Sequence, residues 1–379
     1  MKKLITICLL MVVTFTVNAQ EKKLKAFKDK TTGYFGFKNL KGEVIIKPKY
    51  AEAHEFNEGL AAVKKTGNNW EGNWGFINTS DEIIIPLNKG GVRDFSEGLA
   101  VVLENGNLVY YNKYNQVAVP NTKKYITIEN FSEGLAAVES DNWKWGFIDK
   151  SGNEIIPTQY EYVNKFSDGM AVVHKIIEEG EPEHPPLRSL QGYINNKGKL
   201  IIDYKYYYAS NFKEGFANVS EDSFFTTDRY YINLQGNKIS NKYMYGGLDF
   251  SEGRARVAGK GGSMGFINTE GKEITKLKYK DAKSFSNGFA AVQNENENWG
   301  FIDLDGKEIG EIKYTSVSNF KKNGVALVTL NEAKGVITSS GKIIFMKDNI
   351  TSIQYSDNYF SATDSSGKIF KFDINGNEK

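Results

Sequence analysis

The chain has 379 residues, of which 48 are basic, 46 are acidic and 13 % are aromatic. This near balance of charge, with no basic stripe along the sequence, excludes the electrostatic footprint of a nucleic-acid-binding protein. The one cysteine, Cys8, lies in an N-terminal apolar run, so the rest of the chain offers no disulfide, thiolate metal site or thiol nucleophile.

Residues 1–19 have the pattern of a secretory signal peptide. A basic start is followed by the apolar run Ile5–Val17 and by small residues up to Ala19. Cleavage after Ala19 would leave 360 residues with equal numbers of basic and acidic side chains. No later apolar run reaches the roughly 20 residues that span a bilayer. We therefore predict an exported protein, periplasmic or extracellular, without a membrane-spanning segment after cleavage.

The rest of the chain, residues 20–379, repeats one short phrase. An aromatic residue, two small or polar residues and Gly precede Leu-Ala-x-Val, and Trp-Gly-Phe-Ile follows. The clearest copies are Phe56–Val63 with Trp74–Ile77, Phe131–Val138 with Trp145–Ile148, and Phe285–Val292 with Trp299–Ile302. The spacing gives about ten units of roughly 36 residues, counting incomplete first and last copies. A repeat of this kind decides the architecture, so we predict a single array.

Each unit shows three strand signals and no helix signal. In chain order they are an apolar run such as Leu60–Lys64, an aromatic run such as Trp74–Asn78, and an Ile-rich run such as Glu154–Ile156 that a proline closes. An Asn/Asp-x-x-Gly turn joins the second and third runs. Two degenerate units fill the Trp-Gly position with Tyr110-Tyr111 and Tyr230-Tyr231.

Both faces of these strands are apolar, so each small sheet must be covered on both sides by its neighbours. The sequence therefore predicts an all-β fold of stacked units. Propeller-like blades are favoured because the units are short and buried on both sides. An open β-solenoid-like array is the alternative, since ten units exceed the usual number of blades in a ring.

The repeat resembles the WG (KWG) repeat family of bacterial proteins. Lys144-Trp145-Gly146 is a literal KWG, and the Phe-x-x-Gly-x-Ala-x-Val and Asn/Asp-x-x-Gly-x-x-Ile-Ile-Pro elements match the family's unit over about residues 24–379. The resemblance implies a secreted or envelope-associated module without an assigned reaction. It therefore carries no functional residues over to this chain.

Residues that depart from the repeat are the candidate ligand-binding positions. Trp70 and Trp143 are extra tryptophans in the loop between the first and second strands, where they either bind a sugar or a partner or pack against the edge of their own unit. His174 and His184 flank an acidic, proline-containing insertion at 174–191, which reads as extended. Insertions in repeat arrays often mark a binding face, although plain surface variation is the alternative.

Motifs that suggest chemistry have simpler explanations in the repeat. Gly261–Gly265 matches a nucleophile elbow, but it leads into a strand and no histidine follows it. Asp303–Gly306 resembles the start of a calcium loop, but a sister turn carries Lys197 at the equivalent place. The recurring acids (Glu58, Glu97, Glu133, Glu214 and Glu252) favour a turn role. We predict no catalytic residue, no cofactor and no metal.

Three functions compete on this sequence. The first is a non-enzymatic binding or scaffold protein whose repeat surface contacts a protein of the cell envelope. The second is a carbohydrate-binding module for envelope glycans, and the third is a hydrolase with acids on the face of a propeller. The oligomeric state is not predicted by any feature of the sequence.

Overall fold

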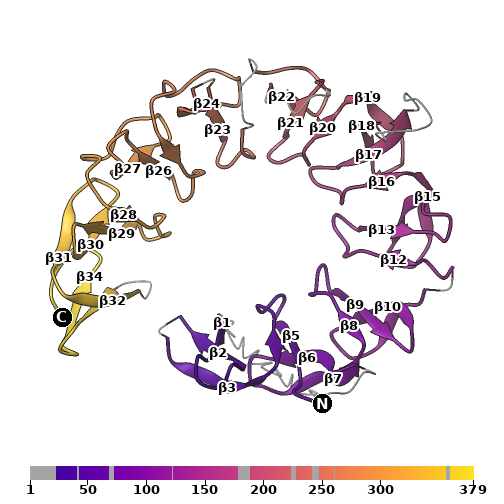
Figure 1. Ribbon diagram of the computed structural model, residues 1–379, viewed down its shortest axis with the longest axis horizontal. Helices are drawn as coiled ribbons and strands as arrows, with labels where there is room; N and C mark the ends of the chain where they lie inside the picture. Colours follow the sequence, from indigo (N-terminus) through magenta and orange to yellow (C-terminus); the bar gives the residue numbers. More distant parts are fainter. Residues whose placement is uncertain are drawn as a thin grey trace, which may run out of the picture.

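The computed structural model describes residues 23–40, 42–67, 72–121, 123–177, 188–222, 228–240, 247–259, 261–355 and 359–379. These residues form 34 strands in ten small antiparallel sheets and include no helix. Figure 1 shows the sheets in chain order around a central opening, like the blades of a propeller. The predicted all-β array of about ten propeller-like units is confirmed.

The sheets are numbered 1 to 10 in chain order. Sheets 1 to 5 contain β1 (Leu24–Lys28), β2 (Phe35–Asn39) and β3 (Val44–Tyr50); β4 (Glu52–Ala53), β5 (Leu60–Lys64), β6 (Trp74–Asn78) and β7 (Ile83–Lys89); β8 (Gly91–Val92), β9 (Leu99–Glu104), β10 (Asn107–Asn112) and β11 (Val117–Val119); β12 (Thr127–Ile128), β13 (Leu135–Glu139), β14 (Trp145–Asp149) and β15 (Glu154–Tyr160); β16 (Tyr162–Val163), β17 (Met170–Ile177), β18 (Arg188–Asn195) and β19 (Leu200–Tyr206). Sheets 6 to 10 contain β20 (Tyr208–Ala209), β21 (Phe216–Ser220) and β22 (Tyr230–Asn233); β23 (Arg254–Ala258) and β24 (Met264–Asn268); β25 (Asp281–Ala282), β26 (Phe289–Gln293) and β27 (Trp299–Asp303); β28 (Ser316–Val317), β29 (Val325–Leu330), β30 (Ala333–Thr338) and β31 (Ile343–Lys347); β32 (Ile350–Tyr355), β33 (Tyr359–Asp364) and β34 (Ile369–Asp373).

Sheet 2 shows how the repeat phrase builds a sheet. The first two predicted strands pair from Leu60 opposite Asn78 to Lys64 opposite Trp74. The third strand is bulged against the second, and a Cβ at Gly75 would collide with the carbonyl oxygen of Ile85. The glycine of Trp-Gly is therefore required by the close approach of the outer strand in the same sheet.

One sequence prediction about the strands was wrong. The third strand does not end at the proline: β3 continues through Pro48 to Tyr50, because an outer edge strand needs no N–H at that position. In seven of the ten described sheets a two-residue strand, which the sequence pattern did not indicate, also pairs with the first long strand, as Glu52 and Ala53 do with Lys64 and Val63. Two residues are too few to give a sequence pattern.

The register also corrects the two degenerate units. Val219 pairs with Tyr230 as Val63 pairs with Gly75, so Tyr230-Tyr231 occupies the Gly-Phe positions and Arg229 the Trp position. In sheet 3, Val101 pairs with Tyr110, so Tyr110-Tyr111 occupies the Phe-Ile positions. The two tyrosines of each pair point to opposite faces of their sheet and join the clusters on its two sides. The motif tryptophan is missing in both units.

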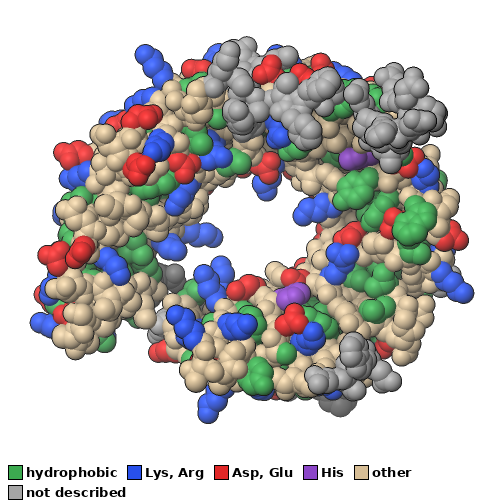
Figure 2. Space-filling view, viewed as in Figure 1, with side chains coloured by type: hydrophobic (Ala, Val, Ile, Leu, Met, Phe, Trp, Pro, Cys, Tyr) green, Lys and Arg blue, Asp and Glu red, His purple; other side chains and the backbone are tan. Residues whose placement is uncertain are grey.

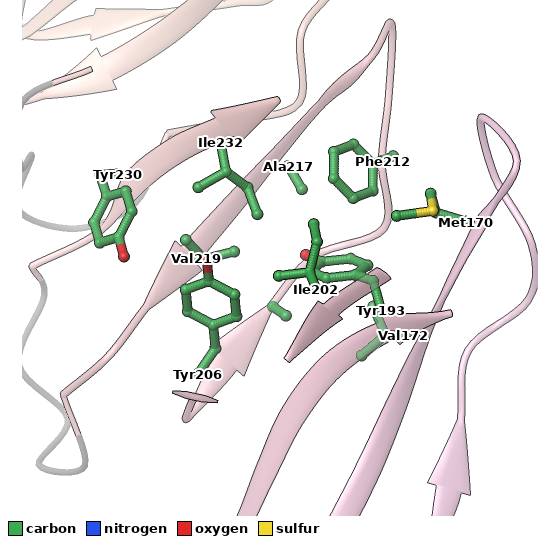
Figure 3. Packing of buried hydrophobic residues seen from close by; sticks show 11 residues of the cluster. Met170, Val172, Tyr193, Ile202, Tyr206, Phe212, Ala217, Val219, Tyr230 and Ile232 are labelled. Atoms are coloured by element: carbon green, nitrogen blue, oxygen red, sulfur yellow. The ribbon is translucent and has the colours of Figure 1, made fainter. Parts of the chain in front are cut away.

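Neighbouring sheets are joined by hydrophobic clusters. Nine clusters of buried residues lie between consecutive sheets, and Figure 3 shows the one between sheets 5 and 6, with Tyr193, Ile202 and Phe212 packed together. Within these clusters an aromatic ring of one sheet's second long strand contacts the Phe that begins the next repeat phrase, as Phe76 contacts Phe95. Eight such ring pairs have centroid distances of 4.7–5.1 Å.

The two ends of the array are adjacent without sharing a core. A Cβ built at Gly42 in sheet 1 would lie 3.6 Å from Nε2 of Gln354 in sheet 10, so the Gly42 turn lies beside sheet 10. Among the described residues, however, no hydrophobic cluster joins these sheets. Figure 1 shows the same arrangement, a ring of sheets whose first and last members face each other. The molecule is propeller-like in shape. Each of its nine hydrophobic cores, however, joins only two consecutive sheets, as in a linear repeat array.

Candidate functional site

The recurring acids join neighbouring sheets, which accounts for their repetition. Glu58 accepts hydrogen bonds from the N–H groups of Glu97 and Gly98 in the next unit, at 2.7 and 2.8 Å. Equivalent contacts are made by Glu97, Glu133, Asp168, Glu214 and Glu252. We call this contact the carboxylate clasp. These glutamates therefore lie in turns, as predicted, and each of them also links its unit to the next repeat.

The edge of the ring opposite the clasps carries the more varied residues. We call it the Trp edge, because Trp74, Trp145 and Trp299 begin their strands there. Figure 2 shows hydrophobic side chains gathered on the visible face over sheets 4 and 5, beside a central opening rimmed by charged groups. The departures from the repeat in these sheets are therefore candidates for contact with a ligand or partner.

His174 belongs to a row of aromatic side chains that crosses from sheet 4 to sheet 5. Its ring lies 5.2 Å from the ring of Tyr162, which in turn lies 5.6 Å from Trp145. Burial lowers the pKa of His174 below its ordinary value of 6.5. Trp145 at one end of the row is 9 % exposed, whereas Tyr162 in the middle of the row is 48 % exposed.

Trp143 is the most exposed aromatic residue near this row. Its side chain is 70 % exposed, and its backbone has a φ of 63°, in the left-handed region. The N–H of Trp143 donates to the carbonyl of Ser140, which closes the tight loop between β13 and β14. The equivalent loop in sheet 8 places Glu297 at the same position with a φ of 64°. An exposure of 70 % does not fit the alternative that Trp143 packs against the edge of its own sheet.

Two predicted positions, Trp70 and His184, lie outside the described residues. The insertion at 174–191 is described at both ends. There, its first and last residues form a β ladder, from His174 opposite Gln191 to Ile177 opposite Arg188. The insertion therefore lengthens β17 and β18 into a hairpin arm, and this corrects the prediction of an extended loop from residue 174. Apolar and β-branched residues at Ile176 and Ile177 favour this pairing.

Sequence reasoning missed three polar residues in sheets 6 and 7. Asn218 and Arg256 share a register position that holds Ala or another aliphatic residue in sheets 1 to 5, 8 and 9. Arg229, at the Trp position of sheet 6, lies over the ring of Tyr208 with its guanidinium carbon 3.7 Å from the centroid. The signal was present in the sequence as Phe-Ala-Asn-Val and Arg-Ala-Arg-Val in place of Leu-Ala-Ala-Val.

The suspected chemical motifs are accounted for by turns. Ser263 leads directly into β24, so no strand–turn–helix elbow is formed. The Asp303 carboxylate accepts the N–H groups of Asp305 and Lys307 and thereby closes its hairpin. Within the described ranges, no group of three or more His, Cys, Asp or Glu side chains could hold a metal ion. The part of the chain that the structure describes contains no helix that could cross a membrane.

The comparisons with known proteins identify the repeat. A family model described as "WG containing repeat" matches residues 35–70, 74–107, 145–175, 192–223, 264–297 and 299–332, which together exceed half of the chain. No curated protein matches the sequence.

Solved structures match this chain at low identity and low TM-score. The computationally designed Ika8 protein is 10 % identical, with 84 % of this chain and 94 % of that chain covered and a TM-score of 0.33. A eukaryotic initiation factor is 14 % identical (93 % and 94 % covered, TM-score 0.45), and BamB from Moraxella catarrhalis is 13 % identical (76 % and 92 % covered, TM-score 0.32). Likeness at this level carries no information about function.

Proposed function

The chain belongs to the family of WG-containing repeat proteins, and on that premise we propose that it is an exported, non-enzymatic binding protein that docks a protein partner on its Trp edge. The observation that carries the proposal is Trp143, a large aromatic side chain that is 70 % exposed on a strained backbone. Strain of this kind persists where a function needs the side chain in that place.

The surroundings of Trp143 suit a protein interface. Trp143 lies two residues before Trp145 in the chain, and Tyr162, which contacts Trp145, is half exposed. Lys144, next to Trp143 in the chain, is ion-paired with Glu161. Aromatic residues surrounded by charged groups are typical of the centres of protein–protein interfaces, where a few side chains supply most of the binding free energy. The acids that would otherwise suggest a hydrolase are occupied in carboxylate clasps, which is why we propose no reaction.

The leader at residues 1–19 supports export, to the periplasm or beyond the cell. The pattern that carries this part of the proposal is the basic start followed by the apolar run Ile5–Val17. N-terminal sequencing of the secreted chain tests it. A mature chain that begins at Gln20 is expected, and retention of the leader in the cytoplasm would refute export.

The docking proposal is tested with the mature chain and two matched variants. Trp143→Ser removes the exposed indole, whereas Tyr114→Ser removes an equally exposed ring (70 %) from the β10–β11 turn. We expect an envelope protein to be retained by the wild type and by Tyr114→Ser but not by Trp143→Ser. The purified partner should then bind the Trp143→Ser variant at least about tenfold more weakly, as expected for loss of a hot-spot aromatic residue. Equal retention by all three proteins would contradict the proposal.

The alternative is a carbohydrate-binding module of the cell envelope. The same exposed indole favours it, because a tryptophan ring can stack on the apolar face of a sugar. Tryptophan fluorescence titrated with neutral envelope glycans distinguishes the two functions. A saturable change that disappears in Trp143→Ser supports the alternative, and a flat titration removes it.

A further inference from the structure

A polar pocket of about 430 Å³ lies where sheets 6, 7 and 8 meet, away from Trp143. It is lined by Tyr208, Ser210, Asn218, Arg229, Gly247, Leu248, Asp249, Arg256 and Ser284. Its volume is in the range of small-molecule sites. Tyr208 and Leu248 are the large apolar side chains of this lining, and most of the others present hydroxyl, amide, carboxylate or guanidinium groups.

The repeat does not need these polar groups. At the position of Asn218 and Arg256, the pairing register places Ala62, Ala137 and Ala291 in sheets 2, 4 and 8. Alanine thus satisfies the packing at this position in the same fold. The two polar replacements occur in adjacent sheets and line the same pocket.

Asn218 is the clearest sign of a missing partner. The residue is only 3 % exposed, and its Oδ1 has no hydrogen-bond partner among the described residues. A buried polar group without a partner is destabilising, because it has lost its hydrogen bonds to water and gained none in the protein. Alanine at the same register position would avoid that cost, so the amide is expected to meet a ligand.

Arg229 supplies the charge of the pocket. Its guanidinium stacks on the ring of Tyr208, and no carboxylate in the described part of the chain lies within ion-pair distance of it. Arg256, by contrast, donates to the carbonyl of Ala282 at 2.7 Å and lies 3.4 Å from Asp281. Arg256 is therefore held by contacts within the fold. The planar guanidinium of Arg229 is available to bind an acidic group in the pocket.

We propose that this pocket binds a sugar acid of the uronate type, with its carboxylate on Arg229 and a ring hydroxyl on Asn218. A hydroxyl group both donates and accepts, so it satisfies either atom of the Asn218 amide, and the Asp249 carboxylate accepts a further hydroxyl proton. An acidic peptide fits less well, because its second acid would meet Asp249. This site goes beyond the proposed protein docking and depends on different residues.

The test uses the full mature chain and isothermal titration with D-galacturonate, with D-galactose as the neutral comparison. We expect galacturonate to bind at least about tenfold more tightly than galactose, because only the acid engages Arg229. Arg229→Gln should abolish this preference. Arg93→Gln, the same change at an arginine paired with Glu129 outside the pocket, should leave it unchanged. Equal binding of the two sugars to the wild type would overturn the proposal.

Asn218→Ala separates a ligand-binding role from a structural one. The change restores the residue found in sister sheets, so we expect thermal stability to stay equal or rise while galacturonate binding weakens about tenfold. Lower stability with unchanged binding would show that Asn218 serves the fold, and the proposal would fail.

Oligogalacturonate serves as a third probe. If it binds more tightly per sugar residue than the monosaccharide does, the natural ligand comes from a polysaccharide. A response to an Asp/Glu peptide with none to galacturonate would overturn the sugar-acid proposal in favour of a peptide ligand.

Discussion

Trp143 holds a backbone conformation that its own side chain disfavours. Left-handed φ values cost residues with a Cβ about 1–2 kcal/mol, and glycine avoids the cost. Other positive-φ sites in the chain are mostly occupied by Asn, Asp, Glu or Gly, which serve turns and clasps. Trp143 closes the β13–β14 turn through its backbone N–H, but this role needs no indole, and the exposed side chain contributes little burial to offset the strain.

Replacing Trp143 by glycine should therefore stabilise the protein. We expect Trp143→Gly to raise the free energy of unfolding by about 1 kcal/mol, and Trp143→Ala, which keeps the Cβ, to change it by less than about 0.5 kcal/mol. Thermal denaturation of both variants and of the wild type at the same pH tests this predicted order of stability. A loss of stability in Trp143→Gly would mean that the indole packs in the folded protein and would weaken its assignment to binding.

Each element of the array is joined to the next by the same small set of contacts. The turn before the first long strand has two successive positive φ values, as at Glu97 (53°) and Gly98 (84°), which is the pattern of a type I′ turn. The Glu side chain is long enough to reach the next sheet. Four serines beside these acids add a hydrogen bond to the next unit's Phe carbonyl, at 2.7–2.8 Å. The repeat phrase thus encodes both the turn and the link to its neighbour.

Removing one clasp should cost measurable stability that depends on pH. Burial acts to raise the pKa of Glu97, but Lys150 and the N–H groups of Gly134 and Glu133 outweigh it and hold the pKa below its ordinary value of 4.5. A carboxyl with a depressed pKa stabilises the fold above 4.5, and this contribution is lost as pH falls through the folded-state pKa. We expect Glu97→Gln to lose about 1–2 kcal/mol at pH 7 and less near pH 3.

The control for this prediction is Glu270→Gln, which removes a carboxylate that pairs with Lys272 on an exposed hairpin. This change should alter stability little at either pH. Denaturant titrations at pH 7 and pH 3 compare the three proteins. A loss in Glu97→Gln that stays constant with pH would show that the clasp does not depend on the charge of the carboxylate.

Comparison of particular elements shows what sequence reasoning can reach. The repeat phrase, the Asn/Asp-x-x-Gly hairpins and the all-β array follow from local patterns, because each depends on residues close together in the chain. The clasp partner of Glu58 lies about one unit away, at Glu97 and Gly98, and no local pattern indicates it. The polar pocket was missed because Asn218 looks like a surface residue until the register places it at a buried position.

At the scale of the whole molecule, the ends of the array are capped by polar substitutions. By strand register, Lys25 and Lys38 in sheet 1 occupy the places of Ala61 and Ile77 in sheet 2. On the outer side of sheet 10, Ser361 and Lys371 occupy the places of an interior Ala and Phe. Terminal repeats with a polar outer face keep a linear array soluble.

Reversing the N-terminal cap should make the chain self-associate. The double variant Lys25→Ala/Lys38→Ile restores the interior residue types and leaves an apolar sheet face without a cover. We expect dimers or larger species by light scattering at micromolar concentration. Lys199→Ala/Lys197→Ile, which removes the same charge from an exposed hairpin, should remain in the wild-type state. If both variants have the same association state, Lys25 and Lys38 do not prevent self-association through the face of sheet 1, and the prediction is wrong.

Among the described residues, no hydrophobic cluster joins sheets 1 and 10, and we call this junction the seam. The seam determines which sheets unfold locally at the lowest free energy. Each interior sheet is covered by hydrophobic clusters on both sides, whereas sheets 1 and 10 each contribute to a single cluster. In a linear array, stability is a sum over neighbours, so units with one neighbour open at a lower free energy. We expect amide hydrogen exchange in β1–β3 and β32–β34 to be faster than in β13–β18, with the difference growing in low denaturant. Uniform protection around the ring would instead require a seam that stabilises its two sheets as strongly as an interior core does.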